Sequence, residues 1–438
     1  MTPRETALQV LIACRREQGW SNGVLKQQLA KAQLSRRDAA LATRLSYGVV
    51  QNRLLLDYYL GQLLTGKSSK LHPVIRDILH LGLYQIKLLD RIPDSAAVHE
   101  SVELAKKCCK KQPYAPGLVN AVLRSAASTQ LSQPKDLATR YSHPQGLVDL
   151  LKSYVGQDKL ESMLIANNGI PETVVQVNTR RTTATQLQAC LEAEGVQVRP
   201  HPWMDSALLV LSGTGSMEQL PSFREGLFYV QDAAARLAVD CAAIPQGADW
   251  RVLDCCAAPG GKSFAAAMAL GEKGSILSCD IHPHKLPLIE AGARRLGIEN
   301  LSTACQDASV PVEDLRARFD LVLCDVPCSG YGIIRKKPDI RYKDPDSMAQ
   351  LHQLQLQILL NQADRVKPCG VLLYSTCTLV RRENEGVVEK FLARRPDFTL
   401  TKLPLPAVFP ENNGMLRLVP GQFDTDGFFI ARLERNHG

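Results

Sequence analysis

From about residue 226 onward, short apolar runs alternate with helical stretches, and this alternation constrains the fold more than any other feature. Helices are expected, for example, at Ser263–Leu270 and Pro283–Leu296. Apolar runs separated by helices are typical of a parallel sheet covered on both faces. The sequence therefore predicts an α/β domain over 226–438. Its strands are expected at Arg251–Leu253, Ser275–Cys279, Leu301–Cys305, Phe319–Cys324 and Val371–Tyr374.

The chain before residue 226 divides into two further predicted units. Apolar residues recur at helical spacing up to about residue 130, for instance over Leu71–Leu88, which predicts an all-helical domain over 1–135. A turn-rich stretch follows it. The next region mixes helix and strand patterns and predicts a small α+β unit over 145–225. The elements expected there are strands at Val174–Asn178 and Ala207–Leu211 and a helix at Thr183–Glu194.

The composition indicates a soluble cytoplasmic protein. Of 438 residues, 45% are hydrophobic and 22% charged, which is ample for sizeable cores. The first 20 residues are too charged for a signal peptide, and no uncharged run reaches the roughly 18 residues of a membrane span. The 13 cysteines show neither a disulfide framework nor zinc-site spacing, so we expect reduced thiols and no metal. Nothing in the sequence demands more than a monomer, and the net charge of +8 fits a nucleic-acid partner.

A loop of small residues joins the first expected strand of the α/β domain to a helix. It reads Asp254-Cys255-Cys256-Ala257-Ala258-Pro259-Gly260-Gly261-Lys262. Small residues let the backbone approach a ligand, and the start of a helix favours an anionic group. Lys262 could pair with a carboxylate or a phosphate. Asp280, at the end of the next strand, could accept hydrogen bonds from ribose hydroxyls, and Asp307, after the third strand, could reach a base amino group.

This loop matches no nucleotide-phosphate motif. Gly261-Lys262-Ser263 looks like the end of a phosphate-binding loop, but Cys256 stands where that motif requires glycine. The pattern G-x-G-x-x-G is absent as well. A small-residue loop between two strands that end in acids instead points to S-adenosylmethionine.

Two cysteines follow the ends of the fourth and fifth expected strands, in Asp325-Val326-Pro327-Cys328-Ser329-Gly330 and Ser375-Thr376-Cys377-Thr378. A single cysteine at a strand end is usually a small buried hydrophobe. Two of them at the same edge of a parallel sheet, one beside an acid, suggest chemistry on cytosine. A thiolate that adds to carbon 6 activates carbon 5 toward a methyl donor, and Asp325, protonated or sharing a proton, could stabilise the charge that develops.

The residues leave three readings open. Either cysteine could be the nucleophile, because the chemistry permits both, and Cys328 as the nucleophile would correspond to a DNA cytosine methyltransferase. A third reading is a non-catalytic RNA-binding or antitermination-like factor with an inactive methyltransferase domain. The intact Gly260, Gly261, Asp280 and cysteine pair argue against such decay.

Several segments resemble the Nop/Sun family of RNA cytosine-5 methyltransferases. They are the loop at 256–262, the two cysteine motifs, Glu383-Asn384-Glu385, the stretch Gly332 to Tyr342, Tyr229-Val230-Gln231-Asp232 and Asp426-Gly427-Phe428-Phe429. This likeness covers about 226–435. The first domain resembles the NusB-like RNA-binding domain, most clearly at Val119-Asn120-Ala121-Val122-Leu123-Arg124. Val326, and lysine at 336 and 337, depart from the residues more usual in the family.

The resemblance implies a Rossmann-like domain that methylates carbon 5 of cytosine in small-subunit (16S) ribosomal RNA through a covalent cysteine–C6 adduct. It makes Cys377 the nucleophile, and Cys328 a residue that assists release, with Asp325 beside them. It places S-adenosylmethionine against Cys256, Ala257, Ala258, Pro259, Gly260, Gly261, Lys262, Asp280, Asp307 and Asp325.

Two basic clusters are expected to contact RNA. One is the run Lys106-Lys107-Cys108-Cys109-Lys110-Lys111 of the helical domain, where phosphate contacts would weaken as salt rises. The other follows the first cysteine and comprises Arg335, Lys336, Lys337, Arg341 and Tyr342. The target base must leave any stack to reach a thiol, so the expected substrate is RNA that has not yet completed ribosome assembly.

Overall fold

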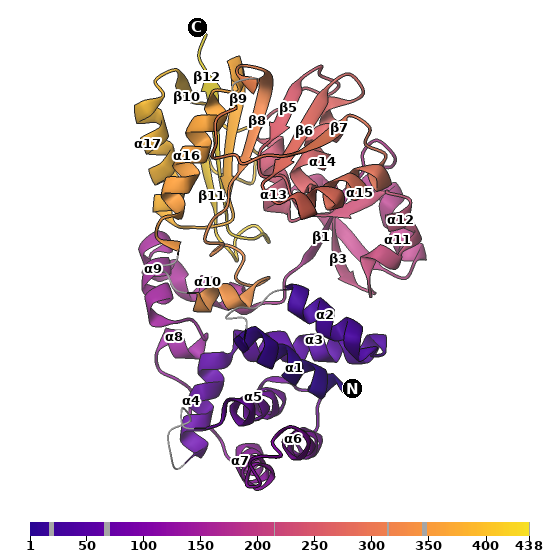
Figure 1. Ribbon diagram of the computed structural model, residues 1–438, viewed down its shortest axis with the longest axis vertical. Coiled ribbons are helices and arrows are strands. Elements are labelled where there is room, and N and C mark those ends of the chain that lie inside the picture. The colour runs from indigo at the N-terminus through magenta and orange to yellow at the C-terminus, as the bar shows by residue number, and fades with distance from the viewer. Residues whose placement is uncertain (17–21, 65–70, 214, 313–314, 344–347, 438) are drawn as a thin grey trace. The chain divides into compact units, whose positions relative to one another are not determined.

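The computed structural model describes residues 1–16, 22–64, 71–213, 215–312, 315–343 and 348–437 (Figure 1). Contacts between Cα atoms divide the chain into two compact units. The first comprises Met1–Gly169 and Ile334–Lys343, and the second comprises Ile170–Ile333 and Asp344–Gly438. Among the described helices, none combines the length and the apolar character needed to cross a bilayer.

The first unit is helical, as predicted. Helix α5 lies at its centre, because it buries residues on every side from Ile75 to Gln85. Gly82 lets α5 approach α7 closely, since a Cβ there would lie 2.4 Å from the Leu123 side chain. The helices are α1 Pro3–Arg16, α2 Asn22–Ala32, α3 Arg36–Gln51, α4 Arg53–Leu63, α5 Pro73–Leu88, α6 Asp94–Cys108, α7 Ala115–Ser128, α8 Leu137–Arg140, α9 Gln145–Val155 and α10 Gln157–Asn168.

Helices α9 and α10 pack in this first unit, although they fall within the segment 145–225 that the sequence assigned to the α+β unit. Their apolar faces, which include Leu147, Leu151 and Leu164, are buried. The pattern of these residues fits any helix-packed core, so the sequence alone did not show which unit they join.

A segment from the far end of the sequence completes the first unit. The 3-10 helix η5, Pro338–Tyr342, brings in Arg341, whose side chain is only 2% exposed. Its guanidinium donates hydrogen bonds to the carbonyls of Gln51 (2.9 Å) and Ser142 (3.1 Å) and to Asn168 Oδ1 (3.0 Å). The Tyr342 hydroxyl lies 3.2 Å from Ser142 Oγ. The prediction that Arg341 contacts RNA is therefore wrong, because its side chain is used inside the protein, whereas the same prediction for the half-buried Tyr342 stays a prediction.

The second unit begins with a small antiparallel sheet of strand order β2-β3-β1-β4. Its strands are β1 Thr173–Val177, β2 Gln197–His201, β3 Met204–Ser212 and β4 Phe228–Val230, with helices α11 Ala184–Ala193, η2 Met217–Gln219 and α12 Pro221–Arg224. Helix α11 starts with a capping box in which Thr183 and Gln186 bond each other's backbone N–H groups. The strands and helix predicted in this region are confirmed.

The larger sheet of the second unit has the order β10-β12-β9-β8-β5-β6-β7, with β11 paired to β12. Strands β5 to β9 are mutually parallel, whereas β12 runs antiparallel between β9 and β10. This is the predicted Rossmann-like architecture. The strands are β5 Arg251–Asp254, β6 Ser275–Asp280, β7 Leu301–Cys305, β8 Phe319–Asp325, β9 Val366–Thr376, β10 Phe398–Leu400, β11 Met415–Leu418 and β12 Phe428–Arg435.

Helices cover both faces of this sheet (Figure 1). One apolar core includes residues of α13, α14 and α15, and another includes residues of α16 and α17. Because β5, β8 and β9 are parallel, their carboxyl ends meet at one edge, where ligands of such sheets bind. The helices are α13 Ala233–Asp240, α14 Gly261–Leu270, α15 Leu286–Leu296, α16 Leu351–Ala363 and α17 Glu385–Arg394, with the short turns η3 Pro283–Lys285 and η7 Arg381–Glu383.

Candidate active site

A cavity of about 730 Å³ opens at the carboxyl ends of β5 and β8. Its walls include the loop after β5, helix α15 and the end of β4. Most of the residues that the sequence assigned to the cofactor site line it. They are Cys256, Ala257, Ala258, Pro259, Gly261, Lys262 and Asp325, whereas Gly260, Asp280 and Asp307 do not line this cavity.

The loop after β5 turns sharply at Gly260. Its N–H donates to the carbonyl of Ala257 (2.7 Å), and its φ of 110° lies in a region that side chains rarely adopt. A Cβ at this position would also lie 2.5 Å from the ring of Phe264. Glycine is therefore required here. The turn starts helix α14, whose ten residues place free backbone N–H groups and a partial positive charge at the cavity.

A buried acid supports the loop from below. The Asp254 side chain is fully buried and accepts a hydrogen bond from Ser263 Oγ (2.7 Å), which in turn accepts one from Ser278 Oγ (2.8 Å). Burial raises the pKa of Asp254 to about 6, despite the bond from Ser263 and the nearby Lys262 ammonium. These hydroxyls link β5, β6 and α14. They could not be singled out from the sequence, because single serines are common inside helices and strands.

Asp280 and Asp307 lie at the ends of the next two strands, as predicted. Oδ1 of Asp280 accepts the N–H of His282 (2.9 Å), and Oδ1 of Asp307 accepts the N–H (2.8 Å) and hydroxyl (2.6 Å) of Ser309. The Ser309 bonds lower the pKa of Asp307. Each carboxylate is oriented through one oxygen, and the other oxygen makes no hydrogen bond to the described residues. These carboxylate acceptors fit the hydroxyl and amino donors of a nucleoside.

The acid at the end of β8, Asp325, is paired with a lysine. Lys262 Nζ lies 2.6 Å from Asp325 Oδ2, and Ser375 Oγ donates to Asp325 Oδ1 (2.8 Å). Burial alone would lower the pKa of Lys262, but the Asp325 carboxylate outweighs it and raises that pKa. Lys262 thus remains charged, and its predicted carboxylate partner is Asp325. That Asp325 is protonated or shares a proton stays a prediction, and Lys262 is the neighbour with which a proton could be shared.

The two cysteines come together as the sequence predicted. Cys328 follows β8, Cys377 follows β9, and their sulfur atoms are 3.2 Å apart. Both side chains are partly buried. The contact with Cys377 and then burial raise the pKa of Cys328 well above its usual value, which keeps this residue a thiol. Two thiols and an ion pair therefore share one edge of the sheet.

The sequence did not predict the side chains that support the two cysteine loops at this edge of the sheet. Glu383 and Asn384, which appeared in a motif without a role, are fully buried beside the cysteine loops, and so is Gln355 of α16. A charged or amide side chain in an otherwise apolar stretch is a weak signal, and only the tertiary contacts reveal the partners. Among the described residues, no three His, Cys, Asp or Glu side chains gather as a metal site.

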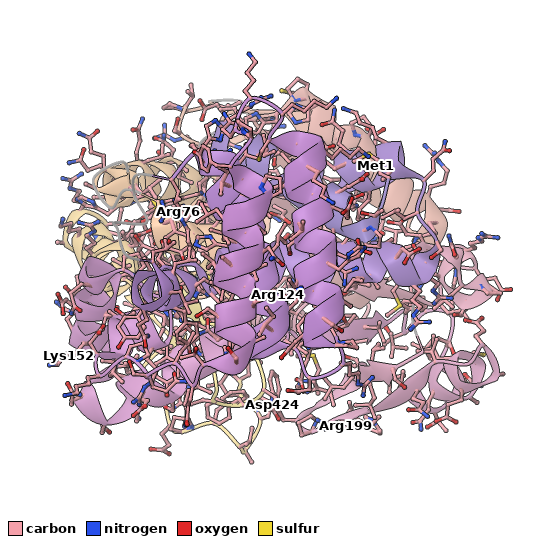
Figure 2. All side chains as sticks on the ribbon, turned by 90° about the horizontal axis from the view of Figure 1, so that it is seen from below. Met1, Arg76, Arg124, Lys152, Arg199 and Asp424 are labelled. Atoms are coloured by element: carbon pink, nitrogen blue, oxygen red, sulfur yellow. The ribbon has the colours of Figure 1, made fainter. Side chains whose placement is uncertain are left out.

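The basic run of the first unit is partly used in ion pairs. Lys106 pairs with Glu103 (2.7 Å) and Lys107 with Glu5 (2.6 Å), whereas Lys110 and Lys111 are exposed. Figure 2 looks onto the helices of this unit, with Arg124 of α7 labelled. Many basic side chains reach the surface in this view, which suits an anionic partner.

Three family models match successive parts of the chain. The NusB family matches residues 1–128, and a ferredoxin-like domain of RsmF/B-type methyltransferases matches residues 143–216. The family described as 16S rRNA methyltransferase RsmB/F matches residues 242–434. Each match falls on a region whose fold is described above.

Solved structures share the fold. The crystal structure of the protein PH0851 superposes with a TM-score of 0.81 at 24% identity, covering 99% of both chains. A methyltransferase homologue from Pyrococcus horikoshii gives a TM-score of 0.60 at 25% identity, covering 68% of this chain and 98% of that one.

Curated relatives match nearly the whole chain. A probable ribosomal RNA small subunit methyltransferase B from Bacillus subtilis (strain 168) is 37% identical over 99% of this chain and 98% of its own. Ribosomal RNA small subunit methyltransferase B from Vibrio cholerae is 36% identical over 93% of this chain and 92% of its own. The chain therefore belongs to the RsmB/F family of 16S ribosomal RNA methyltransferases, which use S-adenosylmethionine as the methyl donor.

Proposed function

We propose that this protein methylates carbon 5 of a cytosine in 16S ribosomal RNA, with Cys377 as the nucleophile that adds to carbon 6. The observation that carries the proposal is the contact of Cys328 and Cys377, with sulfur atoms 3.2 Å apart, at the sheet edge that also bears the Lys262–Asp325 pair. Simple methyl transfer to a nitrogen or oxygen needs no thiol, whereas carbon 5 of cytosine requires a nucleophile and a proton donor.

The addition step uses the ion pair. The Cys377 thiol first loses its proton to solvent. When the thiolate bonds to carbon 6, the C5–C6 double-bond electrons move between carbon 4 and carbon 5 and the C4–N3 electrons move to N3, where a proton passed from Lys262 through Asp325 neutralises the charge. Carbon 5 is then the nucleophilic carbon of an enamine. S-adenosylmethionine, when bound, supplies the electrophilic methyl group that carbon 5 accepts. We assign its binding to the loop at 256–262 together with Asp280 and Asp307.

Release uses the second cysteine. A solvent base takes the proton from carbon 5, the electrons of that bond restore the C5–C6 double bond, and the C6–S electrons return to Cys377. Cys328 donates its proton to the departing sulfur and later recovers one from solvent, while the N3 proton returns through Asp325 to Lys262. Its raised pKa suits Cys328 to this role, because the group is a thiol when the C6–S bond breaks.

The substrate is RNA whose target base is outside a stack, so we infer that the protein acts in the cytoplasm on ribosomal RNA before assembly is complete, and as a monomer. Exposed lysines such as Lys110, Lys111 and Lys337 fit phosphate contacts. Their replacement by alanine should weaken RNA binding and reduce its dependence on salt, since each contact releases about one counterion.

The test compares wild type, Cys377→Ala and Cys328→Ala on unmodified 16S ribosomal RNA with labelled S-adenosylmethionine. We expect Cys377→Ala to transfer no methyl group and form no adduct, and Cys328→Ala to accumulate an adduct that resists denaturation. Nuclease digestion and mass spectrometry locate the methyl group at carbon 5.

Two outcomes would contradict the proposal. If Cys328→Ala is the variant without an adduct, Cys328 is the nucleophile, as in DNA cytosine methyltransferases. If wild type binds the RNA and S-adenosylmethionine but transfers no methyl group to carbon 5, the reaction class is wrong.

A further inference from the structure

Two adjacent buried residues contact the two cysteine loops separately. Glu383 ends the short turn η7, Asn384 follows it, and neither side chain is exposed to solvent. Glu383 contacts the loop of Cys328, whereas Asn384 contacts the loop of Cys377. Neither residue contacts the sulfur atoms through a described hydrogen bond, so any role they have in the reaction acts through backbone position.

Glu383 holds the backbone on both sides of Cys328, with help from Gln355. Its Oε2 accepts the N–H of Ser329 (2.9 Å) and the side-chain N–H of Gln355 (3.0 Å). The same Gln355 amide nitrogen donates to the carbonyl of Pro327 (2.9 Å). The residues before and after Cys328 are thus both fixed to one buried carboxyl group, which leaves the loop little freedom to move.

Asn384 does the same for Cys377. Its Oδ1 accepts the hydroxyl of Thr376 (2.6 Å), and its Nδ2 donates to the carbonyl of Thr378 (3.0 Å). The neighbours of Cys377 on both sides are therefore tied to one amide. A hydroxyl contact between Ser329 and Thr378 (2.7 Å) joins the two loops directly.

We propose that Glu383 and Asn384 are positioning residues that divide the catalytic cycle between them: Asn384 places Cys377 for addition, and Glu383 places Cys328 for release. The two residues are adjacent in the chain, so the two cysteine loops are held by neighbouring side chains of one turn. The turn is also anchored by the Tyr374 hydroxyl, which donates to the Glu383 carbonyl (2.5 Å). This inference rests on the proposed function, in which the two cysteines act in different steps.

Substitutions can separate the roles. Glu383→Gln keeps an acceptor oxygen and the shape of the side chain, so it should behave nearly as wild type. Glu383→Met removes the acceptor and should slow adduct resolution by about 10- to 100-fold, because a shift near 1 Å has effects of that size, while adduct formation changes little. Asn384→Asp keeps the shape but turns the donor to Thr378 into an acceptor, so it should slow adduct formation by roughly tenfold without accumulation of adduct.

The measurement is a single-turnover time course that follows adduct and methylated RNA separately in each variant, with S-adenosylmethionine affinity as a check of folding. Should Glu383→Met lose that affinity, Gln355→Met replaces it, since it removes the donor to Pro327 and to Glu383 Oε2 but keeps the Glu383 carboxylate and its bond from Ser329. The division of roles would be overturned if Glu383→Met and Asn384→Asp slowed the same step. It would also be overturned if Glu383→Met resolved the adduct at the wild-type rate.

A second readout does not depend on RNA. The azo compound diamide oxidises two neighbouring thiols to a disulfide and is itself reduced to the hydrazine, taking up two electrons and two protons. Peptide mapping measures how fast Cys328 and Cys377 become linked. We expect Glu383→Met to slow the linkage by about tenfold and Glu383→Gln to leave it unchanged, since the rate depends on how often the two sulfur atoms meet.

These readouts distinguish two failures. Suppose that Cys328→Ala traps no adduct, but that diamide links Cys328 to Cys377 slowly in Glu383→Met. The proposed chemistry is then wrong, and the positional role of Glu383 stands. If Cys328→Ala traps an adduct and Glu383→Met changes neither resolution nor linkage, the chemistry stands and this inference is wrong.

Discussion

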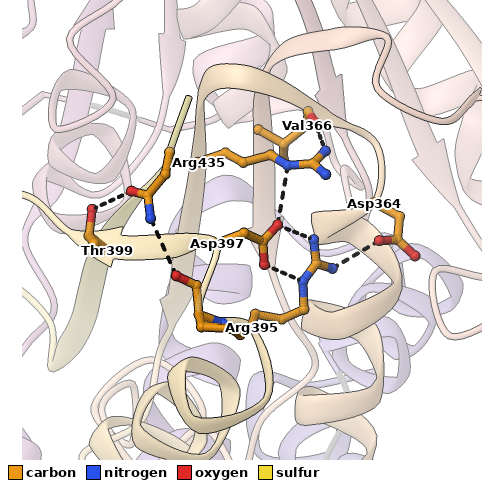
Figure 3. A network of polar contacts seen from close by, with 8 residues as sticks. Asp364, Val366, Arg395, Asp397, Thr399 and Arg435 are labelled. Carbon is orange, nitrogen blue, oxygen red and sulfur yellow. Dashed lines mark hydrogen bonds and ion pairs between the residues drawn. The ribbon is translucent and has the colours of Figure 1, made fainter. Parts of the chain in front are cut away.

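Strand β9 carries a polar network at each end, and the two networks differ in burial. At its carboxyl end, Glu383, Asn384 and Gln355 are buried completely around the cysteine loops. At its amino end, Arg395 lies between Asp397 and Asp364 (Figure 3), whose side chains are 38% and 47% exposed. Helix α17 joins the networks, since it begins after Asn384 and ends at Arg394.

The exposed network has the better ion-pair geometry. Arg395 donates two hydrogen bonds to Asp397 (both 2.8 Å) and one to Asp364 (2.9 Å), and Arg435 Nη1 donates to the carbonyl of Val366 (2.7 Å) (Figure 3). Water and salt screen such pairs, so good geometry contributes little to stability. The buried network contains few charged groups, but its side chains cannot move out into solvent because the protein encloses them. We therefore attribute the proposed positioning role of this end of the strand to burial rather than to the number of ion pairs.

The largest expected effect comes from comparing two lysine–aspartate pairs whose aspartates lie at opposite ends of strand β8. Lys262 pairs with Asp325 at the site and is 11% exposed, whereas Lys367 pairs with Asp320 at the opposite end and is 38% exposed. Lys262→Met should lower kcat/KM for methyl transfer by about 10²- to 10³-fold, because it removes a buried charge beside the reacting ring. Lys367→Met is the matched control and should leave the rate unchanged. Equal losses of kcat/KM in both variants would show that the buried pair and the exposed pair do not differ in their importance for the reaction.

The buried hydrogen bonds of Arg341 have no proposed role in catalysis, so they test the effect of burial on stability alone. Arg341 is buried in the first unit, where burial lowers its pKa to about 10 but leaves it charged at neutral pH. Arg341→Met should destabilise that unit by about 3 kcal/mol, since the carbonyls of Gln51 and Ser142 lose their guanidinium hydrogen-bond donor inside the protein. Urea unfolding measures this, with the exposed Lys337→Met as control. A loss below about 0.5 kcal/mol would show that burial by itself does not make a polar network strong.

The buried Asp254 predicts an unusual pH dependence. Its folded pKa is raised to about 6, so the native state binds its proton more tightly than the unfolded chain does. Stability should therefore fall as pH rises from about 4 to 6, by up to about 3 kcal/mol, and stay level above that range. Asp254→Asn should remove this slope. Thermal melting between pH 4.5 and 7.5 would refute the expectation if wild type and variant changed in parallel.

The smallest effect is expected at the exposed network. The hydrogen bonds from Arg395 lower the pKa of Asp397, so Asp397 stabilises the fold above the unfolded value near 4 and loses that contribution as pH falls through its lowered folded pKa. With solvent screening, Asp397→Asn should cost about 1 kcal/mol or less at pH 7. Urea midpoints measure this loss, and high salt should reduce it. A cost above about 3 kcal/mol would mean that exposed pairs here are as strong as buried ones.

Much of the fold was predictable because it depends on local patterns. The strands from β5 to β9 and the helices between them follow from apolar runs and turn residues, and the meeting of Cys328 with Cys377 follows from strand ends in a parallel sheet. The small residues at 256–262 likewise predicted a ligand loop, and Gly260 has the backbone angle that only glycine adopts readily.

Other features had no local signal. A basic stretch after the active-site loop reads the same whether it faces RNA or, like Arg341, enters the helical unit, because only the partners differ. The pairing of Asp325 with Lys262 had no local signal either, because the two residues are far apart in the sequence.

By itself, the sequence determined the order of the units, the parallel sheet, the ligand loop and the chemistry that two strand-end cysteines make available, since these depend on residue types and spacing along the chain. Only the tertiary structure decided which side chains hold those cysteines in place. Glu383 lies 55 residues from Cys328 in the sequence, and its carboxyl group reaches the backbone beside that cysteine only because β8 and β9 are neighbours in the folded sheet.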